Sequence, residues 1–378
     1  FASFEPLLAE VIALTKEQAA ALVDAGVAST PYDALIDIYE PGATEAELAP
    51  LLADLRVELA PLVHAVADGD IEVDESPVLG VFDVDGQRAF GSMVARTLGY
   101  DFEAGRLDVA AHPFTTSFGD GDVRITWRSE GDDFRGGLFG IMHEAGHAMY
   151  EQGLPAEHAG TPIGRYVSLG VHESQSRLWE NQVGRSREFW TWALPRFKEQ
   201  FPHKHDVTVD AMFKALHTVT PSLIRVEADE ATYNLHIVAR FDLERQIIAG
   251  DVAVRDLPEL WASTYQELLG IRPERVSDGV MQDVHWAAGS VGYFPTYTLG
   301  NLIAAQLFDA AGRDIDDLSG SIASGDFAPL LEWLRSNVHR HGRLLTADEI
   351  VEQATGRPLS SRPFLDYLTA VTKDVYGV

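Results

Sequence analysis

The chain is predicted to be mainly α-helical, with one small β element. Apolar residues recur at intervals of three and four along most of its 378 residues, the period of a helix with one buried face. Apolar and polar residues alternate convincingly only over 107–111 and 122–128. No internal repeat, low-complexity run or long Pro/Gly/Ser linker divides the chain. We therefore expect a single domain, 1–378.

The individual elements follow from caps, apolar stripes and turn residues. Thr44 and Glu47 form a capping-box pattern, and a leucine-rich stripe then predicts a helix that ends near Gly69. Gly119-Asp120-Gly121 is a turn signal, so 107–111 and 122–128 are expected to form a β-hairpin. Similar stripes predict further helices at 134–152, 168–183, 207–249, 255–269, 296–311 and 326–339.

Composition excludes several classes of function. Asp plus Glu number 58 and Lys plus Arg 29, so the formal charge is −29, which disfavours nucleic acid and anionic membranes as partners. Cysteine is absent, which excludes a disulfide framework, a thiol nucleophile and a Cys-based metal site. The sequence has no long apolar run, and acidic residues interrupt its first segment where a signal peptide would be apolar. We expect a soluble, cytoplasmic protein.

A metal-binding pattern lies in the helix predicted at 134–152. His143 and His147 are four residues apart, so both fall on nearly the same helix face and can share one tetrahedral Zn²⁺. Glu144 follows the first histidine directly, so the five residues form the pattern His-Glu-x-x-His. The alternative interpretation is two surface histidines one turn apart.

A catalytic zinc site needs a third protein ligand. Glu151 shares the helix face but lies a further turn along the axis, too far to converge on the same ion. The metzincin continuation is excluded, because Tyr150 and Gly153 stand where that class has Gly and His. The remaining candidates, on the helix predicted at 168–183, are His172, Glu173 and Glu180; spacing does not separate the first two.

Seven ordered motifs between 112 and 301 resemble those of the M32 family of zinc carboxypeptidases, the enzymes related to Taq carboxypeptidase. Only the motif from His143 to His147 is widespread among zinc peptidases, whereas the combination is specific to this family. The motifs are His112-Pro113-Phe114, Asp122-Val123-Arg124-Ile125-Thr126, His143-Glu144-Ala145-Gly146-His147, His172-Glu173-Ser174-Gln175, Ile224-Arg225-Val226-Glu227-Ala228-Asp229, Gly279-Val280-Met281-Gln282-Asp283-Val284-His285-Trp286 and Gly292-Tyr293-Phe294-Pro295-Thr296-Tyr297-Thr298-Leu299-Gly300-Asn301.

The resemblance implies a helical metalloprotease with a deep groove and the β-hairpin near its active site. It implies a hydrolase that removes single residues from peptide C-termini with broad specificity, usually as a homodimer. It also selects Glu173 as the third ligand beside His143 and His147, with Glu144 as general base. Zn²⁺ is the expected cofactor, and Co²⁺ is an alternative that can support activity. The partners expected are peptides with a free C-terminus.

Further site residues carry weaker expectations. The resemblance implies that Arg225 binds the terminal carboxylate of the substrate, and a guanidinium suits that task because it forms two parallel hydrogen bonds. Its alternative is an ion-pairing scaffold residue in a helical context, paired with Glu227 or Asp229. Tyr297 resembles a second carboxylate or oxyanion contact, against the alternative of a core aromatic residue. His285 is a candidate hydrogen-bond donor to the oxyanion. The alternative is a buried histidine whose hydrogen bonds are satisfied within the protein.

The two aspartates and the first two motifs have open roles. Asp229 and Asp283 are candidates to orient ligand histidines through the other ring nitrogen, with helix capping or internal pairing as the alternative for each. His112 to Phe114 and Asp122 to Thr126 are expected to shape the groove wall.

Two rival functions use the same residues. An oligopeptidase or aminopeptidase is possible on the same zinc site, and a non-catalytic helical scaffold would hold a structural metal or none. This chain differs from the family pattern in length. Family members commonly carry another helical segment before the region that matches Phe1, and that segment helps to roof the groove.

Overall fold

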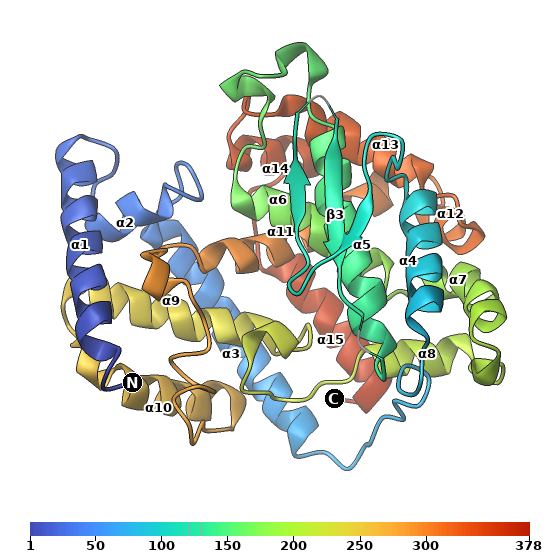
Figure 1. Cartoon of the computed structure of the whole chain (residues 1–378), viewed down its shortest axis with the longest axis horizontal. Helices are drawn as coiled ribbons and strands as arrows, with labels where there is room; N and C mark the ends of the chain where they lie inside the picture. The colour runs from blue at the N-terminus through green and yellow to red at the C-terminus, as the bar shows by residue number, and fades with distance from the viewer. Residues whose placement is uncertain (120, 130) are drawn as a thin grey trace. The chain divides into compact units, whose positions relative to one another are not determined.

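The computed structural model describes residues 1–119, 121–129 and 131–378, and within them it has fifteen α-helices and three strands (Figure 1). The mainly α-helical fold is thereby confirmed. The chain divides into two compact units, each formed from segments that are distant in the sequence. Unit 1 comprises Phe1–Ile71, Val219–Leu299 and Leu365–Val378, and unit 2 comprises Glu72–Thr218 and Gly300–Phe364. The single domain expected from the sequence stays a prediction.

Unit 1 is built from helices, and thirteen of the seventeen residues of α9 are buried. This helix packs against α3 and α10, and nearly all of its side chains up to Phe241 are buried. The capping box expected at Thr44 and Glu47 is present at the start of α3. The α-helices of this unit are α1 (Glu5–Asp24), α2 (Pro31–Ile36), α3 (Glu45–Ala67), α9 (Tyr233–Ala249) and α10 (Leu257–Leu269), with parts of α11 (Pro295–Asp314) and α15 (Arg362–Tyr376).

A buried carboxylate joins several segments of unit 1. Glu244, on α9, accepts hydrogen bonds from the Tyr32 hydroxyl (2.9 Å), the Trp286 indole Nε1 (2.8 Å) and the Gly292 amide (3.0 Å). Its side chain is fully buried. Three donors from separate segments therefore meet at one acidic group, which fixes the 286–292 region against α2 and α9.

Unit 2 combines helices with the small sheet. Its α-helices are α4 (Val84–Leu98), α5 (Phe134–Gln152), α6 (Leu169–Arg177), α7 (Arg187–Gln200), α8 (Val209–Leu216), α12 (Leu318–Ser324), α13 (Ala328–Asn337) and α14 (Ala347–Thr355), with the remainders of α11 and α15. A π-helix, η3 (Leu178–Val183), continues directly from α6. Its strands are β1 (Leu107–Val109), β2 (Thr115–Ser117) and β3 (Val123–Trp127).

The small sheet differs from the predicted hairpin in its pairing. The strand order is β1-β3-β2, with β1 parallel and β2 antiparallel to β3. The hairpin therefore joins β2 to β3, whereas the prediction joined 107–111 to 122–128. Strand β2 was missed because its three residues are all polar and therefore show no alternation of apolar and polar side chains. Asp120, in the predicted turn, lies outside the described residues.

A cluster of phenylalanines positions α5 in unit 2. Phe134, in the first turn of α5, lies 4.8 Å from Phe197 of α7 and 5.7 Å from Phe90 of α4, measured between ring centroids. Such edge-to-face pairs add to the energy of burial. The sheet covers another side of α5 through β3 (Figure 1). This helix, which begins and ends where the sequence predicted, is thus held on several sides.

The helix predicted over 207–249 is wrong as one element. The structure has α8, a 3₁₀ turn at Arg225–Glu227 and then α9. Pro221 explains the break, because proline lacks an amide hydrogen and disfavours helical backbone in the preceding residue. Asp229 then accepts hydrogen bonds from the amides of Thr220, Ala231 and Thr232. Among the described residues, no helix is long and apolar enough to cross a membrane.

Candidate active site

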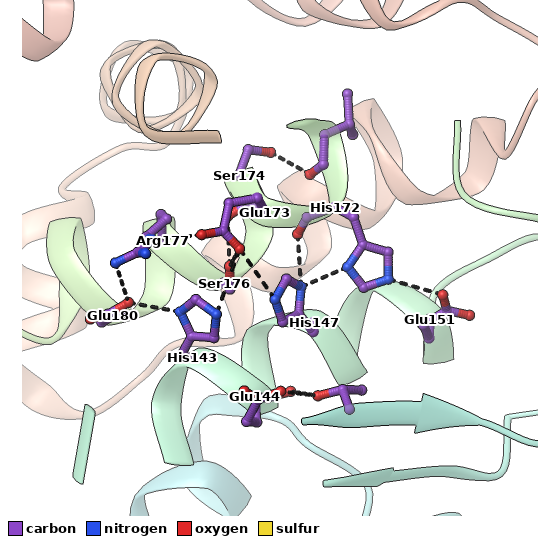
Figure 2. A network of polar contacts seen from close by, with 12 residues as sticks. His143, Glu144, His147, Glu151, His172, Glu173, Ser174, Ser176, Arg177 and Glu180 are labelled. Carbon is purple, nitrogen blue, oxygen red and sulfur yellow. Dashed lines mark hydrogen bonds and ion pairs between the residues drawn. The ribbon is translucent and has the colours of Figure 1, made fainter. Parts of the chain in front are cut away.

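Two neighbouring helices of unit 2 bring three candidate metal ligands together. His143 and His147 lie on α5, and Glu173 lies on α6 (Figure 2). Oε2 of Glu173 is 3.6 Å from Nε2 of His143 and 3.3 Å from Nε2 of His147, and the three ligand atoms lie within 4.8 Å of one another. Metal bonds of about 2.0–2.2 Å at tetrahedral angles separate donors by about 3.3–3.6 Å. The arrangement therefore fits a divalent ion with two imidazoles and one carboxylate.

Two glycines give Glu173 the room to approach the histidines. A Cβ on Gly146 of α5 would lie 2.5 Å from the carbonyl oxygen of Gln175 and 2.7 Å from the α-carbon of Ser176. A Cβ on Gly300 of α11 would lie 2.3 Å from Cγ of Glu173. These distances to α6 are far shorter than a van der Waals separation, so any side chain at either position must displace α6 or Glu173.

The structure separates the candidates for the third ligand. His172 turns its side chain away from Glu173: its Nδ1 lies 2.6 Å from Nδ1 of His147, and its Nε2 lies 3.0 Å from Glu151. Glu180 lies behind His143, with Oε2 2.8 Å from Nδ1. Glu173 is thus the residue whose oxygen faces Nε2 of both histidines.

Glu144 directly follows His143 on α5 and is a further acidic group beside this set. It is 6% exposed, and its Oε2 accepts a hydrogen bond of 2.6 Å from the Thr115 hydroxyl on β2. Burial raises the pKa of Glu144, and the neighbouring His143 and the Thr115 hydrogen bond lower it. Sequence reasoning found Glu144 but missed Thr115, because the strand that carries it gave no signal.

Buried charges around the set influence one another strongly. Burial lowers the pKa of His143, but Glu173 and Glu180 raise it, to about 9 overall. Burial raises the pKa of Glu173, but Arg177 and the two imidazoles hold it well below its usual range. The carboxylates of Glu173 and Glu180 therefore stay ionised, which is the form in which Glu173 can bind a metal.

A second group of predicted site residues lies in unit 1. Asp283 accepts hydrogen bonds from Arg225 through Oδ1 (2.8 Å) and from Arg240 through Oδ2. Both arginines are buried. One carboxylate between two guanidiniums leaves this cluster with a net charge of about +1, and the two cations hold the pKa of Asp283 at about 2 although burial raises it.

Arg225 differs in two respects from the ion-pairing helical residue that was the alternative to its substrate-binding role. It lies in a 3₁₀ turn rather than a helix, and its ion-pair partner is Asp283 rather than Glu227 or Asp229. Its guanidinium lies 4.9 Å from the centre of the Tyr297 ring and donates to the Tyr233 hydroxyl at 3.0 Å. Arg240, which sequence reasoning did not single out, is the other buried partner of Asp283.

His285 and Tyr297 are neighbours in this cluster. Nε2 of His285 lies 3.2 Å from the Tyr297 hydroxyl, and Nδ1 lies 3.8 Å from Oδ1 of Asp283. Burial and the two nearby arginines lower the pKa of His285 to about 4, against the opposing effect of Asp283. The imidazole is therefore neutral at pH 7.

The remaining predicted residues have structural partners. Asp229 caps the turn before α9 with backbone hydrogen bonds and Asp283 pairs with arginines, which agrees with capping and internal pairing rather than with orientation of histidines. Arg124 forms a two-bond pair with Asp122 in the hairpin. Phe114 is half exposed, and its amide donates to the Thr126 hydroxyl.

A helix pair that gathers two histidines and a glutamate, with a further glutamate beside the first histidine, defines a metallopeptidase. The comparisons with known proteins agree. Residues 1–372 match the family described as "Carboxypeptidase Taq (M32) metallopeptidase". The chain belongs to this family, and it is a metallocarboxypeptidase.

Individual relatives and solved structures support the assignment. The chain is 49% identical to thermostable carboxypeptidase 1 of Thermus thermophilus over 380 residues, which is 99% of this chain and 74% of the relative. It is 40% identical to carboxypeptidase 1 of Bacillus subtilis, over all of this chain and 75% of the relative. The crystal structure of an M32 carboxypeptidase from Deinococcus radiodurans matches with a TM-score of 0.95 and 44% identity, over all of this chain and 76% of that one.

Proposed function

We propose that this metallocarboxypeptidase hydrolyses the last peptide bond of peptides with broad side-chain tolerance, using Zn²⁺ held by His143, His147 and Glu173. The observation that carries the proposal is the convergence of one oxygen and two nitrogens on α5 and α6, with Glu144 on the same turn as the first histidine. Co²⁺ suits the same donors. We also propose that the enzyme is a cytoplasmic homodimer and that a deep groove receives the peptide.

The protein's own residues divide the reaction between them. A divalent metal at this position supplies Lewis-acid chemistry, which polarises the scissile carbonyl and makes an attacking water more acidic. Glu144 takes one proton from that water while the oxygen of the water attacks the carbonyl carbon. It then returns the proton to the leaving nitrogen as the C–N bond breaks, so that an acid and a free amino acid result. The Thr115 hydroxyl orients the Glu144 carboxylate meanwhile.

The cationic cluster of unit 1 is the proposed anchor for the substrate carboxylate. Of the five N–H groups of Arg225, the hydrogen bonds to described residues use three, namely two to Asp283 and one to Tyr233. The net positive charge of the cluster favours an anion, and the Tyr297 hydroxyl is a second donor to it. We assign to the neutral imidazole of His285 a hydrogen bond to the developing oxyanion, formed when its contact with the Tyr297 hydroxyl opens.

One experiment tests exopeptidase action directly. An unmodified peptide incubated with the holoenzyme should lose residues one at a time from its C-terminus in a mass-spectrometric ladder, and its C-terminal amide should remain intact. Cleavage of the amide at a comparable rate would contradict the proposed carboxylate anchor.

Glu144→Gln tests the proton transfer. The amide is nearly isosteric but cannot accept the proton of the water, so kcat should fall by several orders of magnitude while metal content and fold are retained. More than a tenth of wild-type turnover in a metal-loaded variant would remove Glu144 from this role.

Arg225 tests the anchor. Arg225→Ala should lower kcat/KM on free-acid peptides by about two orders of magnitude or more, because it removes charge-assisted hydrogen bonds of about 1.5–3 kcal/mol each. Arg225→Lys should recover only part of this loss, since an ammonium keeps the charge but lacks the planar fork. Equal activity of Arg225→Ala and wild type on the free acid would contradict the role.

A further inference from the structure

A carboxylate lies directly behind one of the candidate metal ligands. Nδ1 of His143 faces Oε2 of Glu180 at 2.8 Å, on the side of the ring opposite to Nε2 (Figure 2). Both side chains are largely buried, with 20% and 12% exposed. Glu180 belongs to the π-helix η3, a rare conformation that is frequent at functional sites.

This contact determines which ring nitrogen of His143 is free. An ionised carboxylate only accepts hydrogen bonds, so Nδ1 must carry the hydrogen and donate it to Glu180. In the neutral imidazole, the form that binds a metal, the lone pair then lies on Nε2, the atom that faces Glu173. For His147 the backbone carbonyl of His172, 3.0 Å from Nδ1, has the same effect. Glu180 is therefore the side chain that sets the ring nitrogen offered by the first ligand.

Arg177 links Glu180 to the carboxylate ligand. It lies in the last turn of α6, between Glu173 and Glu180 in the sequence, and it donates to Oε1 of Glu173 at 2.8 Å and to Oε2 of Glu180 at 3.2 Å. The other oxygen of Glu173, Oε2, faces the histidines and also accepts a hydrogen bond of 3.0 Å from the Ser176 hydroxyl. Arg177 thus occupies one oxygen of Glu173 and leaves the other for a metal.

We propose that Glu180 is a positioning residue of the metal centre, fixing the His143 ring directly and restricting Glu173 to one ligand oxygen through Arg177. The inference rests on the proposed function, because it takes His143, His147 and Glu173 as the metal ligands. Its consequence is that metal affinity and coordination geometry depend on a residue that does not touch the metal.

The test measures metal affinity rather than activity. Metal-free wild type and variants are titrated with Zn²⁺ and with Co²⁺ in competition with a chromophoric chelator, and the visible spectrum of the Co²⁺ form reports the coordination geometry. Glu180→Ala should weaken binding by about 10–100-fold, as for other partners of metal-bound histidines. Its Co²⁺ spectrum should differ from that of wild type.

Two conservative variants separate contact from charge. Glu180→Gln keeps an oxygen that can accept the hydrogen of Nδ1, so it should lose less affinity than Glu180→Ala. Glu180→Asp keeps the charge but is one methylene too short for the 2.8 Å contact, so it should lose affinity nearly as far as Glu180→Ala. These variants also provide the answer if Glu180→Ala does not fold.

Controls separate this inference from structural damage and from the proposed function. Glu75→Ala removes another half-buried carboxylate, paired with Arg135 in the first turn of α5, and should leave both metal affinities unchanged. Metal affinities within threefold of wild type in all three Glu180 variants, with Glu173→Ala devoid of metal, would overturn this inference alone. Full metal occupancy in Glu173→Ala would instead overturn the ligand assignment.

Discussion

Replacing Glu244 by glutamine should flatten the pH dependence of stability. Its side chain is completely buried, and burial raises its pKa to about 7, although Tyr32, Trp286 and Gly292 donate hydrogen bonds to it and Arg240 lies near. The ordinary pKa of 4.5 applies in the unfolded chain. Between the two values the folded protein holds a proton that the unfolded chain releases, so this group's contribution to stability is complete below pH 4.5 and lost as the pH rises to 7.

The expected size of this effect follows from the two pKa values. The difference between about 7 and 4.5 corresponds to about 3 kcal/mol of unfolding free energy lost from Glu244 across that range. Glu244→Gln cannot titrate, so its stability relative to wild type should improve by about that amount between pH 4.5 and pH 7.5. The absolute stability also changes because the amide presents an N–H group to one of the three donors.

Urea unfolding at half-unit intervals from pH 4.5 to pH 8, followed by circular dichroism, measures this difference. The comparison cancels the pH dependence that wild type and variant share, including that of metal binding. Glu10→Gln, which removes an exposed carboxylate of the same unit, controls for the loss of one negative charge. A difference between Glu244→Gln and wild type that stays constant within 1 kcal/mol would mean that the three donors keep Glu244 ionised in the folded protein.

Two further substitutions test the packing and the charge balance. Gly300→Ala should weaken Zn²⁺ binding at least tenfold, because its methyl group would lie 2.3 Å from Cγ of Glu173. The dissociation constant is measured in competition with a chelator. An unchanged value would show that Glu173 can accommodate the methyl group and still bind the metal. Asp283→Asn should lower the unfolding free energy by about 3–5 kcal/mol, because it leaves Arg225 and Arg240 buried without their shared counter-charge. A loss below 1 kcal/mol in urea unfolding would contradict that account.

Local patterns determine the features that the sequence predicts best. The capping box at Thr44 and the apolar stripe of α5 depend on residues within a few turns, and both elements are present as predicted. The face shared by His143 and His147 follows from helix geometry alone. The break near Pro221 also has a local signal, the proline itself. Helical apolar spacing continues on both sides of it, however, and this spacing led to the prediction of one continuous helix.

Features that depend on packing between distant segments were not predictable. His172 and Glu173 are about 100° apart on one helix, so only the orientation of α6 against α5 decides which of them faces the histidines. Position 300 needs a residue without a side chain because α11 passes close to Glu173, and that approach is a property of the folded protein. The parallel pairing of β1 with β3 likewise has no signal in residue alternation.

The buried cluster of Arg225, Asp283 and Arg240 also has a consequence for substrate encounter. Its charge of about +1 acts at short range, whereas the net charge of −29 acts on a peptide still in solution. The Debye length shortens from about 30 Å at 0.01 M salt to about 8 Å at 0.15 M, so added salt screens the long-range repulsion first. Acidic peptides should therefore associate faster as ionic strength rises, and strongly basic peptides should associate more slowly.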